Sequence, residues 1–530
     1  MSAEGGSRRL DAFFIILSQG CGREKNRWYV PTLELHLVSL EFCKACRSIP
    51  TLHVRVDDHA PLSLWSSNKK SRNGSKTRAS EDHGSSRVPL VPALRLTWSL
   101  PMGTLLREAA IELWGQSKIV RLRGPLSVAS FASTMWPRGL EHLVVDSRLP
   151  LSVEAVCWPV SLYRISLGGA FNQPITGTVW PASLQQLSFG YHFNQPITGA
   201  AWPASLQQLS FGAMFNQPIE AVVWPATLQR LHLGYWFNQS VARVSWPASL
   251  QELDFTWNFD QPIAEVVWPA SLQQLTFGYR FNQKIEEVKW PACLRQIVFG
   301  SRFNRPIARI VWPACLRQLR FKGAFDQPIH LVSWPASLEV LSFGWQFDQP
   351  VAKVGWPTSL QTLRLPGQFR HPISEVVWPS SLQQLSFGYW FNQPIAGVVW
   401  PASLQKLTFG LNFNQPITEV LWPASLRELK LGDEFCHPIV GVAWPVSLRK
   451  LSLGKRFNEP ISGAVWPASL EELSFGDMFD QPITGTVWPK ALRKLKLGPK
   501  FGQPVEGVIW PGSLVLLSYG VGSQPVLRAA

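Results

Sequence analysis

The sequence has few charged residues, few cysteines and no long apolar segment. Of its 530 residues, 16% are charged, whereas ordinary globular domains carry about 25%. Seven Cys are too sparse for a disulfide scaffold, which favours an intracellular protein, cytoplasmic or nuclear. The longest apolar run near the start, residues 12–17, is far shorter than the ~18–20 residues that span a bilayer. We therefore expect no membrane span.

Residue groups that carry catalysis or bind metal ions are also scarce. The sequence has no Gly-rich phosphate loop and no Ser/His/Asp set, and its ten His are scattered. Cys43 and Cys46 have the spacing of a zinc-binding pair, with His53 and His59 downstream, but a second pair at a defined spacing is missing. No inserted loops carry the clustered carboxylates of a carbohydrate-cleaving enzyme. We expect no enzyme, no cofactor and no metal site.

Tryptophan is abundant instead, with 26 Trp against seven Tyr, and the Trp repeat regularly. Trp-Pro occurs 18 times from Trp136 to Trp510, always at an interval of 22 residues. Leu stands four residues after each of these Trp, and a series of 16 Phe keeps the same period from Phe171 to Phe501. A fixed period of this length is the signature of a solenoid of stacked coils.

The apolar spacing within one period predicts two extended segments, joined by two turns, and little helix. Residues 184–189 read Leu-x-x-Leu-x-Phe, which places alternating side chains on one side of a short strand. Residues 219–224 repeat this spacing on the opposite limb. Gly190 permits a bend after the first strand, and Pro181 and Pro196 fix the backbone at two corners.

Stacked coils bury an apolar side that one coil cannot bury alone, because each position lies over its equivalent in the next coil. We expect Asn or Asp, present at 13 of 16 turn positions, to form a hydrogen-bond ladder. The exceptions are Arg370, Cys436 and Gly502. Cys293 and Cys315 stand at equivalent positions of adjacent coils, and we expect free thiols there. The residues assigned to structural ladders are Trp180, Trp202, Trp312, Leu184, Leu187, Phe193, Asn194, Phe215 and Asn216.

Composition divides the chain into five parts. Residues 1–65 form a region of unclear fold, and residues 66–88 are a basic, Ser-rich linker that we expect to be disordered. Residues 89–135 resemble degenerate coils that form an N-terminal cap, residues 136–522 form the repeat array, and 523–530 a short tail. The predicted fold is a repeat solenoid, mainly β: a parallel β-solenoid of about 18 coils of 22 residues.

The informative positions are the two that follow the strand and its Gly, because they differ from coil to coil. They lie between two inward Phe, so at least one side chain of each pair should face solvent. Tyr, Trp and Arg at such positions are typical of interface hot spots, although the rings can also stack on one another without binding a partner. The candidate partner-binding residues are Tyr191, His192, Tyr235, Trp236, Trp257, Tyr279, Arg280, Trp345, Tyr389 and Trp390.

The motif LxxLxFGxxFNQPI, with PxSL upstream, resembles the FNIP repeat, a relative of the leucine-rich repeat, over residues 136–520. The resemblance implies an LRR-like parallel solenoid that binds proteins through its ridge and strand face. Family members often carry an F-box ahead of the array, which implies a substrate-recognition subunit of a ubiquitin ligase and ubiquitin-ligase components as partners. Residues 1–65 lack the Leu-Pro start and helical Leu pattern of an F-box.

A single-stranded RNA or other nucleic-acid binder is a further alternative, because the net charge is +15 and aromatic residues recur. Residues 131–530 carry 31 basic and 24 acidic residues, so this part of the chain has a charge of only +7. Asp433, Glu434, Glu471 and Glu472 interrupt any basic stripe. The charge pattern therefore favours a protein partner of unknown identity, bound by a non-catalytic scaffold, over nucleic acid.

Overall fold

The computed structural model describes residues 156–520 without a break, together with 136, 139–145, 153 and 154. Elsewhere it describes only the backbones of short strands. The predicted linker at 66–88, the Cys43–Cys46 pair and most of the region where an F-box would stand lie outside the described residues. The chain divides into two compact units, Met1–Tyr235 and Trp236–Ala530.

Short strands are the only regular elements of the first unit among its described residues. β1 and β2 are antiparallel, and each later neighbour from β2 to β10 pairs in parallel. The strands are β1 (Arg23–Glu24), β2 (Arg27–Val30), β3 (Leu52–Val56), β4 (Arg95–Trp98), β5 (Ile119–Leu122), β6 (His142–Val145), β7 (Arg164–Leu167), β8 (Gln186–Ser188), β9 (Gln208–Ser210) and β10 (Arg230–His232).

The second unit continues the same pattern with one strand in each coil. Neighbours from β11 to β23 pair in parallel, and β24 pairs antiparallel with β23. The strands are β11 (Glu252–Asp254), β12 (Gln274–Thr276), β13 (Gln296–Phe299), β14 (Gln318–Phe321), β15 (Val340–Ser342), β16 (Thr362–Leu365), β17 (Gln384–Phe387), β18 (Lys406–Thr408), β19 (Glu428–Lys430), β20 (Lys450–Ser452), β21 (Glu472–Ser474), β22 (Lys494–Gly498), β23 (Leu516–Tyr519) and β24 (Val526–Leu527).

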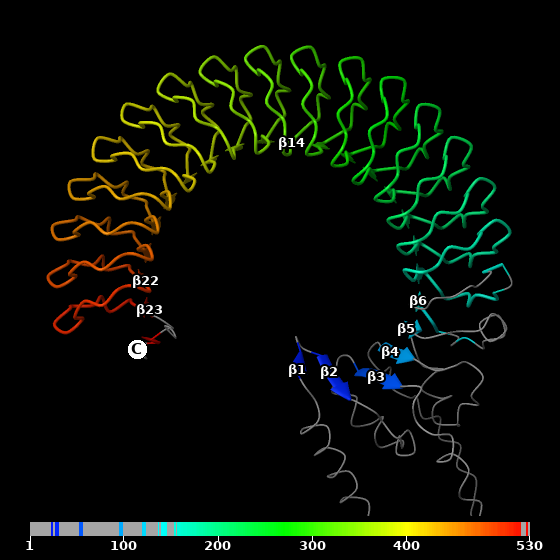
Figure 1. Ribbon diagram of the computed structural model, residues 1–530, viewed down its shortest axis with the longest axis horizontal. Helices are drawn as coiled ribbons and strands as arrows, with labels where there is room; N and C mark the ends of the chain where they lie inside the picture. The colour runs from blue at the N-terminus through cyan, green and yellow to red at the C-terminus, as the bar shows by residue number, and fades with distance from the viewer. Residues whose placement is uncertain are drawn as a thin grey trace, which may run out of the picture. The chain divides into compact units, whose positions relative to one another are not determined.

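The register of these pairs confirms the predicted parallel β-solenoid with 22-residue coils. Leu275 lies opposite Ile297, and Leu407 opposite Leu429, each one period apart in the sequence. Within the second unit the coils fan out so that the strands line the inner, concave side (Figure 1). One strand per repeat of 20–29 residues is also the arrangement of leucine-rich repeats. No described residue is helical, and a search of the described residues finds no helix that is long and apolar enough to cross a membrane.

The core of each coil consists of the ladder residues that the period predicted. Leu184, Phe193 and Phe215 are fully buried, and Leu187 is nearly so. In many coils a Phe at the end of the strand or just after it stacks on the Phe that follows the next turn, as in the pair Phe255–Phe259, whose ring centroids are 4.0 Å apart. In other coils Leu replaces the first Phe. These paired rings continue from coil to coil, so the solenoid is filled by columns of aromatic and aliphatic side chains.

The opposite limb forms no strand among the described residues. The extended segment predicted there, residues 219–224, is interrupted by a turn that Val222 N closes by donating to Ile219 O at 3.2 Å. Each regular coil therefore contains one strand and three turns rather than two. In one coil the turns fall at residues 257–258, 264–265 and 270–271. The coils on this limb are farther apart than paired strands: the stacked rings of Trp400 and Trp422 have centroids 6.4 Å apart, more than the ~4.8 Å that separates hydrogen-bonded strands.

The Gly after each strand is required by close packing between coils rather than by a bend. Gly190 and Gly300 are not in the left-handed region, whereas Gly463 in the outer turn has φ of 83°. A Cβ on Gly190 would lie 1.9 Å from the carbonyl oxygen of Gly168 in the preceding coil. Where Pro366 replaces this Gly, the next residue, Gly367, takes a φ of 72°, so the backbone deviates locally.

Replacing Gly300 with Ala should therefore destabilise the array. The added Cβ would lie 1.6 Å from Gly278 O, and such overpacking typically costs about 1–3 kcal/mol. Gly355→Ala is the matched control, because no heavy atom lies within 4 Å of its added Cβ. Urea unfolding monitored by Trp fluorescence should show a lower midpoint for Gly300→Ala only. Equal midpoints for both variants would contradict the packing argument.

The Trp column stabilises the opposite limb by packing. Trp180 and Trp312 are buried, whereas Trp202 is half-buried. The buried Nε1 of Trp312 has no hydrogen-bond acceptor within the protein, so this side chain contributes through its apolar surface and contacts.

Trp312→Ala should lower the free energy of unfolding by about 3–5 kcal/mol, the usual loss for a buried aromatic side chain. The neighbouring Val311 is exposed, so Val311→Ala should change stability by no more than about 0.5 kcal/mol. Denaturant titrations of the two variants beside the unchanged chain provide the measurement. A loss below about 1 kcal/mol for Trp312→Ala would show that the column is not a stabilising element.

Candidate protein-binding ridge

The variable pair of each coil forms a turn that the neighbouring coil holds in place. In one coil, Phe281 N donates to Gly278 O at 3.2 Å and closes the turn around Tyr279 and Arg280. Arg280 N donates to Trp257 O in the preceding coil at 2.8 Å. The same bond links Met214 to Tyr191 and Arg302 to Tyr279. We call this line of turns the ridge; its backbone is ordered by the coil stack, and only its side chains vary.

Three ridge side chains of the second unit form an aromatic and basic cluster. Trp257 and Tyr279 stack with ring centroids 4.1 Å apart and planes inclined by 7°. The Arg302 guanidinium lies 5.8 Å from the centroid of the Tyr279 ring, within the range of a cation–π contact. The two rings are nonetheless 39 and 37% exposed. Stacking therefore orders the cluster while leaving much of its surface open to solvent.

A second cluster contains Trp345, Tyr389 and Trp390. Trp345 and Tyr389 come from coils that are two periods apart, yet their ring centroids lie 5.9 Å from each other. The coil between them carries Gly367 on the ridge, which leaves room for this contact. Tyr389 meets Trp390 edge to face at 5.0 Å. All three side chains are exposed.

The remaining candidates also lie on the ridge. In the first unit, Tyr191 is exposed and meets His192 edge to face, and Tyr235 is exposed as well. In the second unit, Trp236 and Arg280 are exposed. The structure thus places all ten predicted residues at the surface and brings some of them into contact. Whether they bind a partner stays a prediction.

The strand face beside the ridge changes character along the second unit. The strand of Trp257's own coil carries the acidic residues Glu252 and Asp254, whereas the next three coils place the neutral Gln274, Gln296 and Gln318 at the position of Glu252. Toward the C-terminus their equivalents alternate in charge: Lys406, Glu428, Lys450, Glu472 and Lys494. Equivalent positions of adjacent strands lie side by side, so this alternation pairs opposite charges.

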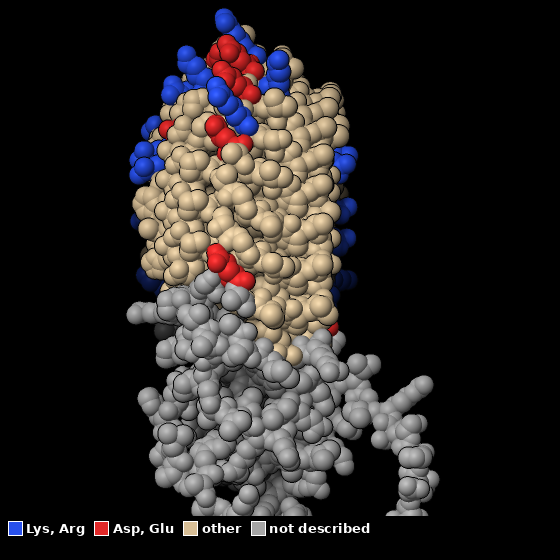
Figure 2. Space-filling model, turned by 90° about the vertical axis from the view of Figure 1, so that its right-hand side faces the viewer, with Lys and Arg blue, Asp and Glu red and all other residues tan. Residues whose placement is uncertain are grey.

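The C-terminal charges are largely used within the protein. Glu472 contacts Lys450 at 3.3 Å and Lys494 at 2.8 Å, and Lys406 contacts Glu428 at 2.7 Å. On the ridge of the same region, opposite charges of adjacent coils also form ion pairs, with Lys455–Asp433 at 2.8 Å and Arg456–Glu434 at 3.0 Å. In the view of Figure 2 the basic residues lie mainly along the two edges of the described part, and its middle carries few charges. Because acids alternate with bases from Lys406 to Lys494, this row is not a continuous basic stripe of the kind that tracks a nucleic-acid backbone.

The Asn side chains form the expected hydrogen-bond ladder between coils, and the Gln that follows each Asn also donates hydrogen bonds to the preceding coil. Asn194 N donates to Asn172 Oδ1 at 2.8 Å, and Asn194 Oδ1 accepts from Asn216 N at 2.9 Å. Gln217 Nε2 donates to both Asn194 O and Asn194 Oδ1 at 3.0 Å. Sequence reasoning missed this second role, although the near-constant Gln was a visible signal.

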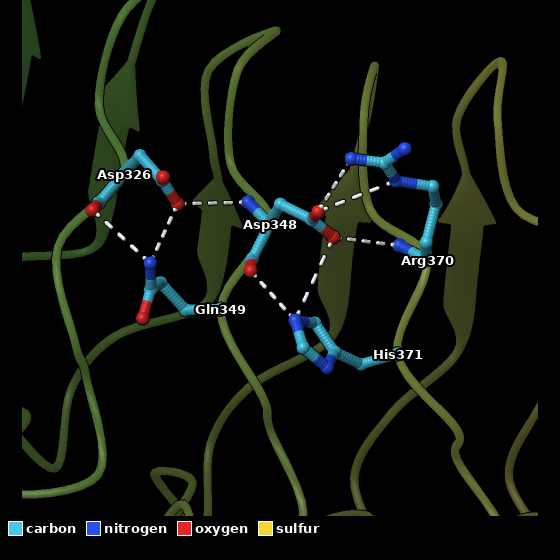
Figure 3. A network of polar contacts seen from close by, with 5 residues as sticks. All are labelled: Asp326, Asp348, Gln349, Arg370 and His371. Atoms are coloured by element: carbon cyan, nitrogen blue, oxygen red, sulfur yellow. Dashed lines mark hydrogen bonds and ion pairs between the residues drawn. The ribbon is translucent and has the colours of Figure 1, made fainter.

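The ladder changes chemistry where Arg370 and His371 replace Asn and Gln (Figure 3). Asp348 Oδ1 accepts from Arg370 N at 2.9 Å, and Asp348 Oδ2 accepts from the Arg370 side chain at 3.0 and 3.3 Å. His371 Nε2 lies 2.6 Å from Asp348 O and replaces the amide that Gln349 presents to Asp326. An ion pair thus takes over the structural contact, and this cluster resembles the ladder around it rather than a catalytic site.

A column of hydroxyl groups, also missed, links the coils on the strand side of the Trp-Pro turn. Ser183 Oγ donates to Leu162 O at 2.8 Å, and Ser337 Oγ donates to Leu316 O at the same distance. Cys293 and Cys315 replace this Ser in two adjacent coils, where both are exposed, free cysteines. Their position in a structural column accounts for their adjacency.

The described residues contain no group of three His, Cys, Asp or Glu that could hold a metal ion. Cys436 has His437 beside it in the sequence, and its Sγ donates to Glu459 Oε1 at 3.4 Å. Burial raises the pKa of the Cys436 thiol above its ordinary value, and a thiol with a raised pKa is a poor nucleophile. This cluster therefore lacks the activated thiolate of a cysteine enzyme.

Two carboxylates in the C-terminal coils should make the stability of the array depend on pH. The hydrogen bond from Gly502 N lowers the pKa of Asp480, and the hydrogen bond from Lys494 lowers the pKa of Glu472. Their contribution is complete above the ordinary values of 3.8 and 4.5 and is lost as the pH falls through the lowered ones. The double variant Asp480→Asn, Glu472→Gln should lose less stability between neutral pH and pH ~3 in urea titrations. An unchanged acid sensitivity would contradict the assignment.

Comparison with known proteins identifies the repeats. The FNIP Repeat family model matches residues 193–236, 237–280, 325–368, 369–412, 391–434 and 435–478. Comparison with curated proteins finds no match.

Comparison with solved structures finds similar chains, and three of them are described here. CroV588, described as a circular LRR protein, is 26% identical over 80% of this chain and 88% of its own, with a TM-score of 0.38. An internalin, inlF of Listeria monocytogenes, is 14% identical over 60 and 82%, with a TM-score of 0.36. The Toll–Spatzle complex of Drosophila is 11% identical over 71 and 60%, with a TM-score of 0.50. At this identity the last similarity concerns the fold alone.

Proposed function

We propose that this chain, which contains FNIP repeats at six positions, is a non-catalytic scaffold that binds a protein partner through its ridge. The observation that carries the proposal is the cluster of Trp257, Tyr279 and Arg302, which is ordered by stacking and still exposed. Trp, Tyr and Arg dominate the energetics of protein interfaces. Rigid side chains lose little entropy on binding, so the pre-stacked rings suit this role.

The neighbouring strand face supports a protein partner over nucleic acid. Gln274, Gln296 and Gln318 offer amide donors and acceptors beside the rings, as the polar rim of an interface does. Several basic residues further along the array, such as Lys450 and Lys494, are paired with acids, which weakens the field they offer to a phosphate backbone. We also infer an intracellular location, because the described cysteines are unbridged.

The non-catalytic assignment rests on the residues that could otherwise carry chemistry. Asp348, His371 and Cys436 all serve the turn ladder, where each has a structural hydrogen bond to an adjacent coil. Each coil keeps the 22-residue length, so no inserted loop builds a pocket. Catalysis needs such irregular, convergent groups.

Affinity capture with a ridge variant tests the proposal. The triple variant Trp257→Ala, Tyr279→Ala, Arg302→Ala should lose at least ~10-fold of specific partner binding, because hot-spot side chains each contribute about 2 kcal/mol or more. The matched control is Lys455→Ala, Arg456→Ala, at equivalent ridge positions whose charges are paired internally. The experiment uses the full chain, quantitative mass spectrometry and nuclease-treated lysate.

Partners that the triple variant loses and the control keeps would support the ridge as the recognition surface. Their direct contact is then checked with the purified partner and cross-linking to ridge residues. If both variants capture the same proteins as the unchanged chain, the aromatic cluster is structural and the proposal fails. If nuclease removes all partners, the surface recognises nucleic acid instead.

A further inference from the structure

A second apolar surface lies away from the ridge, on the limb that leads from the outer turn back to the next strand. The residue before each Trp of Trp-Pro points outward on this limb: Val399 is exposed, whereas its neighbours Val398 and Trp400 are buried. The outward residues of the C-terminal coils form what we call the valine row. Its members, all of them exposed, are Val377, Val399, Leu421, Ala443, Val465, Val487 and Ile509.

The valine row is almost fully exposed, which is unusual for aliphatic side chains that follow one another in space. Six of its seven members are between 79 and 86% exposed. Single exposed aliphatic residues are common on protein surfaces, but contiguous ones usually mark a contact surface. Here the coil stack places them next to one another, because each stands at the same position of successive coils.

The row is unbroken only in the C-terminal coils of the second unit. In the earlier coils of this unit, Ser245, Lys289, Ser333 and Gly355 hold four of the equivalent positions. Outward Val residues such as Val267 and Val311 are therefore separated there by polar or small residues. A continuous apolar row is not a general property of the repeat.

The same limb of those earlier coils is also charged. Two residues before the row position stand Arg243, Glu265, Glu287, Arg309 and Lys353, all exposed. In the coils of the row these positions hold Gly, except for Glu375 and Glu419, both exposed. On the other side of the row stand mostly Ala or Val, with Lys490 as the charged exception. The row therefore has fewer charged neighbours than the equivalent positions of the earlier coils.

The size of this surface approaches that of a protein interface. Stacked Trp next to the row have centroids 6.0–6.5 Å apart, so six intervals from Val377 to Ile509 span roughly 38 Å. The five residue steps from Gly463 to Ala468 add a width of at most ~16 Å at ~3.3 Å per residue. The resulting area of roughly 600 Å² compares with about 800 Å² per partner in a standard interface.

We propose that the valine row is the contact between two copies of this chain. A second copy presents a row with the same spacing, set by the same coil stack, so side chains can match over the full length. The row lies on the limb opposite the strand, and in each coil its residue stands between two turns, as Val465 does between residues 462–463 and 468–469. A two-fold axis along the limb of a central coil therefore lays one curved stack on the other, with the rows antiparallel.

The charges of the limb fit this occupant. A surface with few charges can face its own copy with little like-charge repulsion, whereas the charged side chains Arg243, Glu265 and Lys353 of the earlier coils would lose hydration on contact. The proposal goes beyond the ridge function, because the row and the Trp257 cluster lie in different coils. Each can be removed without changing the other.

The test is the oligomeric state of the full chain, measured by sedimentation velocity over a wide range of protein concentration. The unchanged chain should show a concentration-dependent dimer. Val465→Glu combined with Val487→Glu should weaken the dimer by at least about 100-fold, because unpaired charges are strongly disfavoured in an apolar contact. Both residues are exposed, so the fold should be retained, and circular dichroism checks this.

Val267→Glu combined with Val311→Glu is the matched control. These two residues hold the same position, are similarly exposed, and lie in the coils whose limb is charged. The control should dimerise like the unchanged chain. A monomer at all concentrations would overturn the proposal, as would a dimer that the Val465, Val487 variant leaves intact. A dimer weakened equally by both variants would overturn the assignment to the C-terminal row.

Discussion

The parallel register between coils is the constraint on which the rest of the structure depends. Because neighbouring strands pair at an interval of 22 residues, each side chain lies beside its own equivalent. Each position therefore favours residue types that pack well against, or form hydrogen bonds with, the same residue type in the next coil. These are Leu and Phe in the core, Asn along a turn, and Gly where backbones touch. Charges satisfy the rule by alternating, as Lys450, Glu472 and Lys494 do.

This constraint explains why much of the fold could be predicted from sequence. A strict period reveals the coil length, the inward Leu and Phe, and the parallel arrangement before any coordinate is known. The number of strands per coil was less accessible, because the inward spacing of Ile219, Val222 and Trp224 is shared by a strand and by a limb that contains a turn. The distance between coils on this limb decides whether strands can pair there, and the pattern within one repeat does not express that distance.

The candidate site was predictable in position but not in surroundings. Coil-to-coil variation pointed to the ridge, yet the stacking of Trp257 on Tyr279 and the contact between Trp345 and Tyr389 depend on neighbouring coils. The role of Gly190 was misread for the same reason, since the carbonyl that occupies its space belongs to another coil. The valine row escaped notice because an outward Val and an inward Val look alike in a sequence until the limb's orientation is known.

The distribution of charge links the two proposed surfaces. Most charged side chains of the C-terminal strand face and ridge form ion pairs with one another, so few of them are available to bind a partner. The surface of these coils that has no such internal contact is apolar: it is the valine row on the other limb. The coils around Trp257 show the reverse, with charges on that limb and aromatic rings on the ridge. A single repeat thus yields two contact surfaces in different coils, and a partner on the ridge leaves the row open to a second copy.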